Sequence, residues 1–120
     1  MSKFMALFTA APNAFEQWNA QDPDTRKALE AKGMQAWFDW QERHQSIIVD
    51  AGGPLGKTKR ADANGVSDSR NDIGGYVIIE AESHDAAARL FENHPHFSIL
   101  PGNAVEIMPC TAIPTMEDLK

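Results

Sequence analysis

The chain lacks the features that would place it outside a reducing, aqueous compartment. Its 120 residues contain one cysteine, Cys110, which excludes an internal disulfide and a paired-cysteine metal site. No apolar run approaches the ~20 residues that a membrane-spanning helix needs. The apolar stretch near the N-terminus is too short for a signal peptide and leads directly into polar residues. We therefore expect a cytoplasmic protein that does not insert into a membrane.

Basic residues are also scarce. The 11 Lys and Arg residues are outnumbered by 17 Asp and Glu residues, which gives a net charge of −6. The only basic cluster, Lys57, Lys59 and Arg60, is too small for the electrostatic footprint of a nucleic-acid-binding protein. The nearby glycines lack the Lys-Ser/Thr ending of a phosphate-binding loop. We expect neither a nucleic-acid partner nor a bound cofactor.

The overall composition is typical of one globular domain. Hydrophobic residues make up 42% of the chain and charged residues 23%, which argues against general disorder. We find no internal repeat, low-complexity tract or domain linker. The expected division is a domain over residues 1–110 and a C-terminal tail over residues 111–120.

Residues 74–97 carry the clearest structural pattern. After Gly74-Gly75, the run 76–79 (YVII) is typical of a buried strand. Ser83 is a candidate N-cap for a following helix, because its hydroxyl can accept a hydrogen bond from a free helix N–H. Pro95 predicts the end of that helix, since proline lacks the N–H that a helix interior requires.

The first strand, expected over residues 3–9, has two apolar faces. Phe4, Ala6 and Phe8 point to one side, and Met5 and Leu7 point to the other. A strand with one solvated face would alternate apolar and polar residues instead. We therefore expect helices on one face of the sheet and a second copy of the protein on the other, forming a homodimer.

The other elements follow from periodicity and turn signals. Apolar residues at helical spacing predict a helix over about 25–45, and Gly33 inside it indicates a close backbone approach to the sheet. The remaining elements are a single helical turn within the polar connector 11–24, a strand at 47–49, irregular hairpin arms at 57–62 and 65–69 around Asn64-Gly65, and a last strand at 104–109. This order predicts an α+β ferredoxin-like fold, an antiparallel sheet with two main helices on one face.

Several segments together resemble the YCII-related family, including its DGPF branch. They are GGYVIIEAES followed by HPHF, the closing AVEIMPC, the helical WFDW, and DAGGPLG after it. The resemblance covers roughly residues 3–110. It implies a ferredoxin-like subunit that pairs through its sheet into a dimeric α/β barrel. Where the branch has Asp-Gly-Pro-Phe, this chain has Asp68, Ser69, Arg70 and Asn71, so only the aspartate matches.

The resemblance also implies a possible chemistry, because some members are similar to enzymes that transfer protons with a His–Asp pair. A carboxylate beside a histidine orients the ring and stabilises its protonated form. His44, near the end of the long helix, and Asp50, just after the second strand, form one candidate pair. Helix capping by His44 is the alternative.

His94 and His96 are the other candidate bases, with Asp50 or Asp68 as a partner. His94 continues the apolar stripe of the second helix, and His96 lies just beyond Pro95. Structural capping and packing are the alternative for both. Two histidines could also bind a metal, but no third ligand is evident, so we expect no metal site. His84, at the start of the helix, is expected to be a solvated surface residue.

Arg60 and Arg70 lie in the polar loop region and are candidates for binding an anionic substrate, with simple solvation as the alternative. The leading prediction is an acid–base lyase or isomerase that acts on a compact small molecule. The rival is a non-catalytic ligand-binding or protein-interaction module with structural histidines. A cofactor-free monooxygenase is a third possibility, which rests on the resemblance alone.

Overall fold

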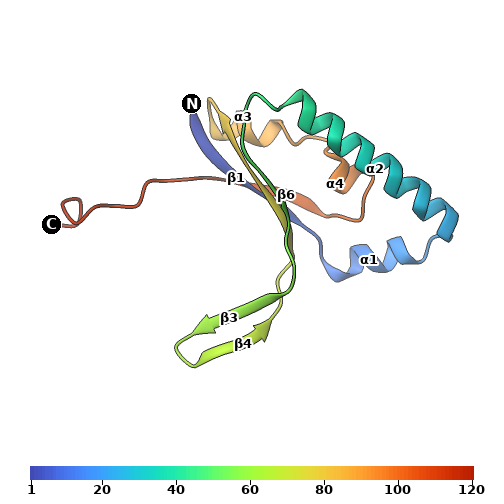
Figure 1. The fold of residues 1–120 in the computed structure, drawn as a ribbon, viewed down its shortest axis with the longest axis horizontal. Coiled ribbons are helices and arrows are strands. Elements are labelled where there is room, and N and C mark those ends of the chain that lie inside the picture. Colours follow the sequence, from blue (N-terminus) through green and yellow to red (C-terminus); the bar gives the residue numbers. More distant parts are fainter.

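The computed structural model describes all residues 1–120 as an antiparallel sheet with helices on one face (Figure 1). The sheet contains four strands in the order β2-β5-β1-β6: β1 (Ser2–Thr9), β2 (Ile48–Pro54), β5 (Ile73–Ala81) and β6 (Ala104–Pro109). Neighbouring strands are all antiparallel. Each helical connection passes over one intervening strand, which is the split βαβ connectivity. The predicted ferredoxin-like α+β fold is confirmed.

Four helices connect the strands: α1 (Pro12–Asn19), α2 (Pro23–Arg43), α3 (His84–Arg89) and α4 (Pro95–Ser98). Local sequence explains where they begin. The Asp22 carboxylate accepts a hydrogen bond from Thr25 N at 3.1 Å at the start of α2. Ser83 caps α3 as predicted, with its hydroxyl 3.0 Å from Ala86 N.

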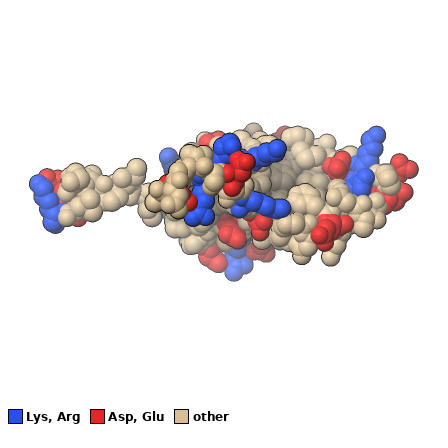
Figure 2. All heavy atoms as spheres, turned by 90° about the horizontal axis from the view of Figure 1, so that it is seen from below, with Lys and Arg blue, Asp and Glu red and all other residues tan.

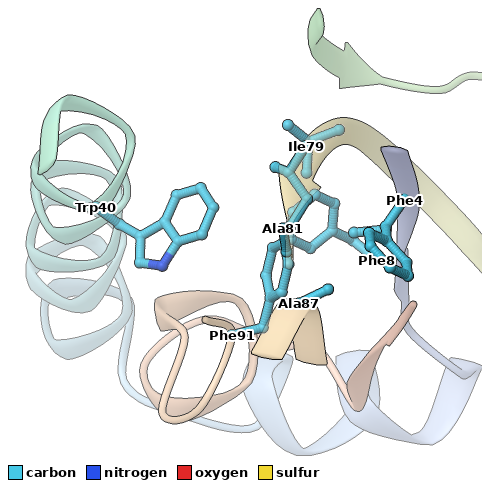
Figure 3. Packing of buried hydrophobic residues seen from close by; sticks show 9 residues of the cluster. Phe4, Phe8, Trp40, Ile79, Ala81, Ala87 and Phe91 are labelled. Atoms are coloured by element: carbon cyan, nitrogen blue, oxygen red, sulfur yellow. The ribbon is translucent and has the colours of Figure 1, made fainter. Parts of the chain in front are cut away.

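The core lies between the sheet and the helices (Figure 3). The inward residues of the two central strands pack against α2 and the α3 region: Phe4, Ala6, Phe8, Val77, Ile79 and Ala81 against Trp40, Ala87 and Phe91. Trp40 points from α2 toward Phe91 and the sheet. Its indole Nε1 donates to Leu90 O at 2.9 Å, which fixes α2 against the end of α3.

Two segments project from this body (Figure 1). Strands β3 (Thr58–Asp62) and β4 (Gly65–Ser69) form a separate two-stranded hairpin. Acidic and basic side chains are interspersed over it (Figure 2). Residues 111–120 extend away from the sheet beyond β6 and expose Ile113, Met116 and Leu119.

The structure corrects several predicted element boundaries. The connector 11–24 contains the two-turn helix α1 rather than a single turn, and the hairpin arms are regularly paired rather than irregular. The second strand runs through the glycines to Pro54 instead of ending at residue 49. The helix after Ser83 ends at Arg89, and Pro95 begins the separate helix α4, because a proline fits the first turn of a helix as well as it ends one.

Candidate functional site

A cleft of about 540 Å³ lies between α2 and the end of the sheet where β2 and β5 meet. This volume is within the usual range of small-molecule sites. Helix α1 and the loop after α4 complete its walls. The lining residues are Phe8, Ala10, Phe15, Met34, Trp37, Phe38, Trp40, Gln41, Ile48, Ala51, Gly52, Gly53, Pro54, Gly74, Gly75, Tyr76, Val77, His96, Leu100 and Pro101.

The sheet wall of the cleft is shaped by bulges in β2. The register between β2 and β5 slips on both sides of Asp50. Gly52 has a positive φ of 63°, and a Cβ there would lie 1.9 Å from Tyr76 O, so only glycine fits. The Asp50 carboxylate accepts a hydrogen bond from Gly52 N at 2.9 Å and stabilises this turn. Asp50 therefore holds the wall of the cleft in shape.

His96 is the histidine that lines the cleft. Its Nε2 lies 2.7 Å from the carbonyl oxygen of Thr9, at the end of β1. A carbonyl only accepts, so Nε2 carries the proton and donates it, and Nδ1 of the neutral ring holds a lone pair. Nδ1 has no protein partner and is not enclosed, because His94 Nε2 is the only fully buried, unpaired side-chain nitrogen or oxygen. An unpaired, accessible imidazole nitrogen at an apolar cleft can accept a proton.

The loop after α4 holds the His96 ring in place. A Cβ on Gly102 would lie 2.4 Å from Cε1 and Nε2 of His96, so the glycine lets the loop pack directly on the imidazole. Burial lowers the pKa of His96, and the hydrogen bond to the Thr9 carbonyl opposes this effect. His96 is therefore neutral at neutral pH, the form that a general base requires.

His94 lies behind the cleft wall and is only 1% exposed. Its Nδ1 accepts a hydrogen bond from His96 N at 3.0 Å, so His94 acts as the N-cap of α4. Burial, with smaller contributions from His96 and His44, lowers its pKa to about 4. The structure therefore places His94 as a neutral support for the backbone that carries His96.

The unpaired His94 Nε2 is surrounded by aromatic rings. The rings of Trp37 and Trp40 lie edge-to-face with the imidazole at centroid distances of 4.6 and 4.9 Å. His94 Nε2 is therefore buried without a hydrogen-bond partner in an aromatic environment.

His44 and His84 lie away from the cleft lining. His44 is the C-cap of α2 and packs on Trp40 with a centroid distance of 4.7 Å. Burial, and to a smaller extent Arg43, lowers the pKa of His44. His84 is exposed, yet its Nε2 lies 2.7 Å from Ile107 O and its ring stacks on Phe4. His84 therefore caps a carbonyl of β6 and is more than a solvated side chain.

The predicted charged site residues lie on the hairpin or in the connector after it. Asp68 pairs with Lys59 at 2.7 Å, and Arg60 pairs with Asp62 at 2.9 Å. Arg70 follows β4 and is exposed. None of the five ion pairs involves a histidine, so neither Asp50 nor Asp68 is brought into contact with a histidine ring.

Sequence reasoning missed three contributors to the cleft. They are the Thr9 carbonyl, Gly102 and the amide of Gln41. Gly102 lies just before the predicted last strand, and nothing in the sequence linked it to His96. No cluster of three or more His, Cys, Asp or Glu side chains is arranged to hold a metal ion.

This sheet topology, with an apolar cleft under the long helix, defines a ferredoxin-like α+β subunit. The chain belongs to the YCII-related domain family, whose profile matches residues 2–111. The resemblance noted from the sequence is therefore confirmed.

One similar solved structure is the 5-chloro-2-hydroxyhydroquinone dehydrochlorinase TftG from Burkholderia phenoliruptrix AC1100, in complex with 2,5-dihydroxybenzoquinone. The TM-score is 0.55 at 20% sequence identity, and the match covers 91% of this chain and 93% of the other. At this identity the similarity concerns the fold. No curated protein matches the chain.

None of the helices has both the length and the apolar character that crossing a membrane requires.

Proposed function

We propose that this protein is an enzyme that moves a proton on a small molecule bound in the cleft, with His96 as the general base. The observation that carries this proposal is the state of the His96 ring. Its Nε2–H is held by the Thr9 carbonyl, its other nitrogen has no protein partner, and the residue belongs to the lining of the apolar cleft. This arrangement fixes both the tautomer and the orientation of a base.

In the proposed step, Nδ1 of His96 takes a proton from a C–H or O–H group of the substrate. The electron pair left behind moves into the adjacent bond. In a lyase it expels a leaving group from the neighbouring atom, and in an isomerase the imidazolium returns the proton to a different atom. The Thr9 carbonyl dipole stabilises the imidazolium formed in between.

Of the two predicted carboxylate partners, Asp50 lies closer to the cleft along the chain, immediately before the lining residues 51–53. Its carboxylate is bound to Gly52 N, so we assign it to the cleft wall. Asp68 is bound to Lys59 on the hairpin. In this proposal the Thr9 carbonyl takes the orienting role that a carboxylate plays in a His–Asp pair.

We further propose that two copies pair through the sheet face that the helices leave open. Apolar side chains from three adjacent strands meet there: Met5, Leu7, Tyr76, Ile78 and Met108. Polar residues surround this patch, for example Lys3 opposite Glu80 and Glu106 opposite Leu7. An apolar patch with a polar rim is typical of a protein–protein interface.

The name of the similar dehydrochlorinase suggests the first reaction to test, the loss of HCl from a chlorinated ring compound. We expect the protein to release chloride from 5-chloro-2-hydroxyhydroquinone or to incorporate solvent deuterium into the unchlorinated compound. His96→Asn should reduce either rate by at least about 100-fold, the usual contribution of a general base. His84→Asn is the matched control, because His84 is outside the cleft, and it should keep the wild-type rate.

Turnover that survives in His96→Asn would contradict the assignment of the base. The alternative function is a non-catalytic ligand-binding module, and one observation favours it. The rings of His84, His94 and His96 are each bonded to a backbone group, as expected of structural histidines. Ring compounds that bind in the cleft but undergo neither exchange nor elimination would establish that module.

A further inference from the structure

The cleft contains no charged side chain. Charged residues make up 23% of the chain, yet Asp, Glu, Lys and Arg are all absent from the twenty lining residues. The polar side chains of the lining include the amide of Gln41 and the ring of His96. His96 is neutral, because burial lowers its pKa. A charged ligand would therefore lose its hydration without gaining an opposite charge.

None of the charged side chains around the cleft, including Lys32 and Arg43 on α2, belongs to its lining. A shallower neighbouring hollow shares Phe38 and Gln41 with the cleft and adds the carboxylate of Glu42, which disfavours anions further. Basic side chains lie on the projecting hairpin, where Figure 2 shows them interspersed with acidic ones. Lys59 and Arg60 are each paired with an aspartate there. Lys57 and Arg70 form no ion pair, but all four side chains are exposed to solvent, which screens their charge.

One long wall of the cleft is made of aromatic side chains and the opposite wall is rich in glycine, an arrangement that suits a flat ligand. Helix α2 contributes aromatic side chains, among them Trp37 and Phe38. The opposite wall contains the glycine pairs 52–53 and 74–75, which present backbone in place of side chains. A Cβ at Gly75 would lie 3.0 Å from Gly53 O, so a side chain there would crowd the neighbouring strand. Aromatic side chains facing a thin backbone wall favour a planar ring.

From these observations we propose that the cleft selects an uncharged, planar ring compound and rejects the carboxylate or ammonium analogue of the same ring. This proposal rests on the proposed function only in taking the cleft as the ligand site. It does not depend on His96 acting as a base. The ligand class that it names is a neutral, planar ring.

The test uses three probes that share one ring: benzamide, benzoate and benzylamine, the last two charged at pH 7.5. Binding to the full-length protein is measured by calorimetry in 0.15 M NaCl, with displacement of Trp37 and Trp40 NMR signals reporting the site. We expect benzamide to bind at least tenfold more tightly than either charged probe. Benzoate or benzylamine binding as tightly as benzamide, or no binding of benzamide, would overturn the proposal.

A charge introduced into the cleft should reverse the preference. Gln41→Lys is expected to strengthen benzoate binding at least tenfold and to change benzamide binding less than threefold. If Gln41→Lys lowers the melting temperature, Phe38→Lys is used instead to introduce the positive charge. Phe38 is 58% exposed at the rim of the cleft, so the lysine is expected to be tolerated. If a folded lysine variant bound benzoate no more tightly than the wild-type protein, the absence of charged side chains from the cleft would not explain its preference for neutral ligands.

The His96→Asn variant separates this inference from the proposed function. It should keep the wild-type preference for benzamide over benzoate and benzylamine, because His96 contributes no charge to the site. Loss of turnover with retained selectivity supports both proposals. Turnover retained in His96→Asn contradicts the base alone, and loss of selectivity in the wild-type protein contradicts the cleft inference alone.

Discussion

The buried imidazole of His94 makes the stability of the fold depend on pH. Its pKa is about 4 in the folded protein and about 6.5 in the unfolded chain. Between these values the unfolded state binds more protons, so the free energy of unfolding falls as the pH is lowered from 6.5 to 4. The stabilisation is complete above pH 6.5. The full loss from this group is about 3 kcal/mol.

Urea unfolding between pH 7.5 and 4.5 checks this prediction, with His94→Asn as the comparison. An asparagine side chain can still accept the hydrogen bond from His96 N but does not titrate. The wild-type unfolding free energy should fall more steeply than that of the variant, by about 1 kcal/mol per pH unit. His96 and His44 titrate in both proteins, so the difference between the slopes reports His94. Parallel curves would mean that the pKa of His94 is the same in the folded and the unfolded state.

Gly102 is expected to control the position of the His96 ring. In Gly102→Ala the new methyl group would overlap Cε1, Nε2 and the backbone O of His96, so we expect the loop and the ring to move apart and the contact with the Thr9 carbonyl to be lost. We expect a loss of about 1–3 kcal/mol in stability and disappearance of the Nε2–H tautomer signal in ¹H–¹⁵N NMR. Gly56→Ala is the control, because nothing lies within 4 Å of a Cβ there. A wild-type His96 spectrum in Gly102→Ala would refute this role of the glycine.

These contacts also show what the sequence could reveal about the site. His96 could be identified as a candidate base, because histidine is the side chain that titrates near neutral pH. The group that orients its ring could not be identified from the sequence. This group is the backbone carbonyl of Thr9, which lies 87 residues away in the chain. Any residue type carries such a carbonyl, so the sequence pointed to Asp50 and Asp68 instead.

Helix α2 passes close to the loop after α4 through Gly33. The sequence indicated a close approach at this glycine but placed it at the sheet, whereas its neighbour is Leu100. A Cβ at Gly33 would lie 2.5 Å from Leu100 Cγ. Alanine has a helix propensity about 1 kcal/mol better than glycine, but this overlap costs about 1–3 kcal/mol.

We therefore expect Gly33→Ala to lower the unfolding free energy by about 1 kcal/mol in the wild-type protein. In a Leu100→Ala background the same change should be stabilising by up to about 1 kcal/mol, because the overlap is gone and the propensity gain remains. Urea unfolding of the four proteins forms a double-mutant cycle. The same sign in both backgrounds would rule out the contact as the reason for the glycine.

The elements themselves were more predictable than their ends. The strand at 76–79 and the Ser83 cap are local patterns, and both are present. Pro95 was misread because its ring is compatible with either the end or the first turn of a helix. His94 determines that Pro95 begins a helix here, because its ring accepts a hydrogen bond from His96 N and caps α4. That interaction depends on the packing of His94 against Trp37 and Trp40, which only the tertiary fold provides.

The single chain is more extended than a compact domain of its length. Its radius of gyration is 17.1 Å, whereas about 14 Å is expected for 120 residues. The projecting hairpin and tail account for the difference, and the open face of the sheet lies uncovered between them (Figure 1). These features suit a subunit that completes its packing against a second copy.

Ile78 lies at the centre of that open face, opposite Met5, while its neighbours Val77 and Ile79 point into the core. Ile78→Asp should therefore leave the subunit folded but place a charge in the proposed interface, where burying it is unfavourable. We expect the wild-type protein to have a dimer mass in analytical ultracentrifugation at micromolar concentration. The variant should sediment as a monomer with an unchanged far-ultraviolet circular dichroism spectrum.

Met34→Asp is the matched control for this interface, because Met34 is 44% exposed on α2, on the opposite side of the sheet. It makes the same apolar-to-acidic change and should leave the dimer intact. A wild-type protein that sediments as a monomer would contradict the interface directly. A dimer that persists in Ile78→Asp but dissociates in Met34→Asp would instead place the contact on the helical layer, where it would restrict access to the cleft.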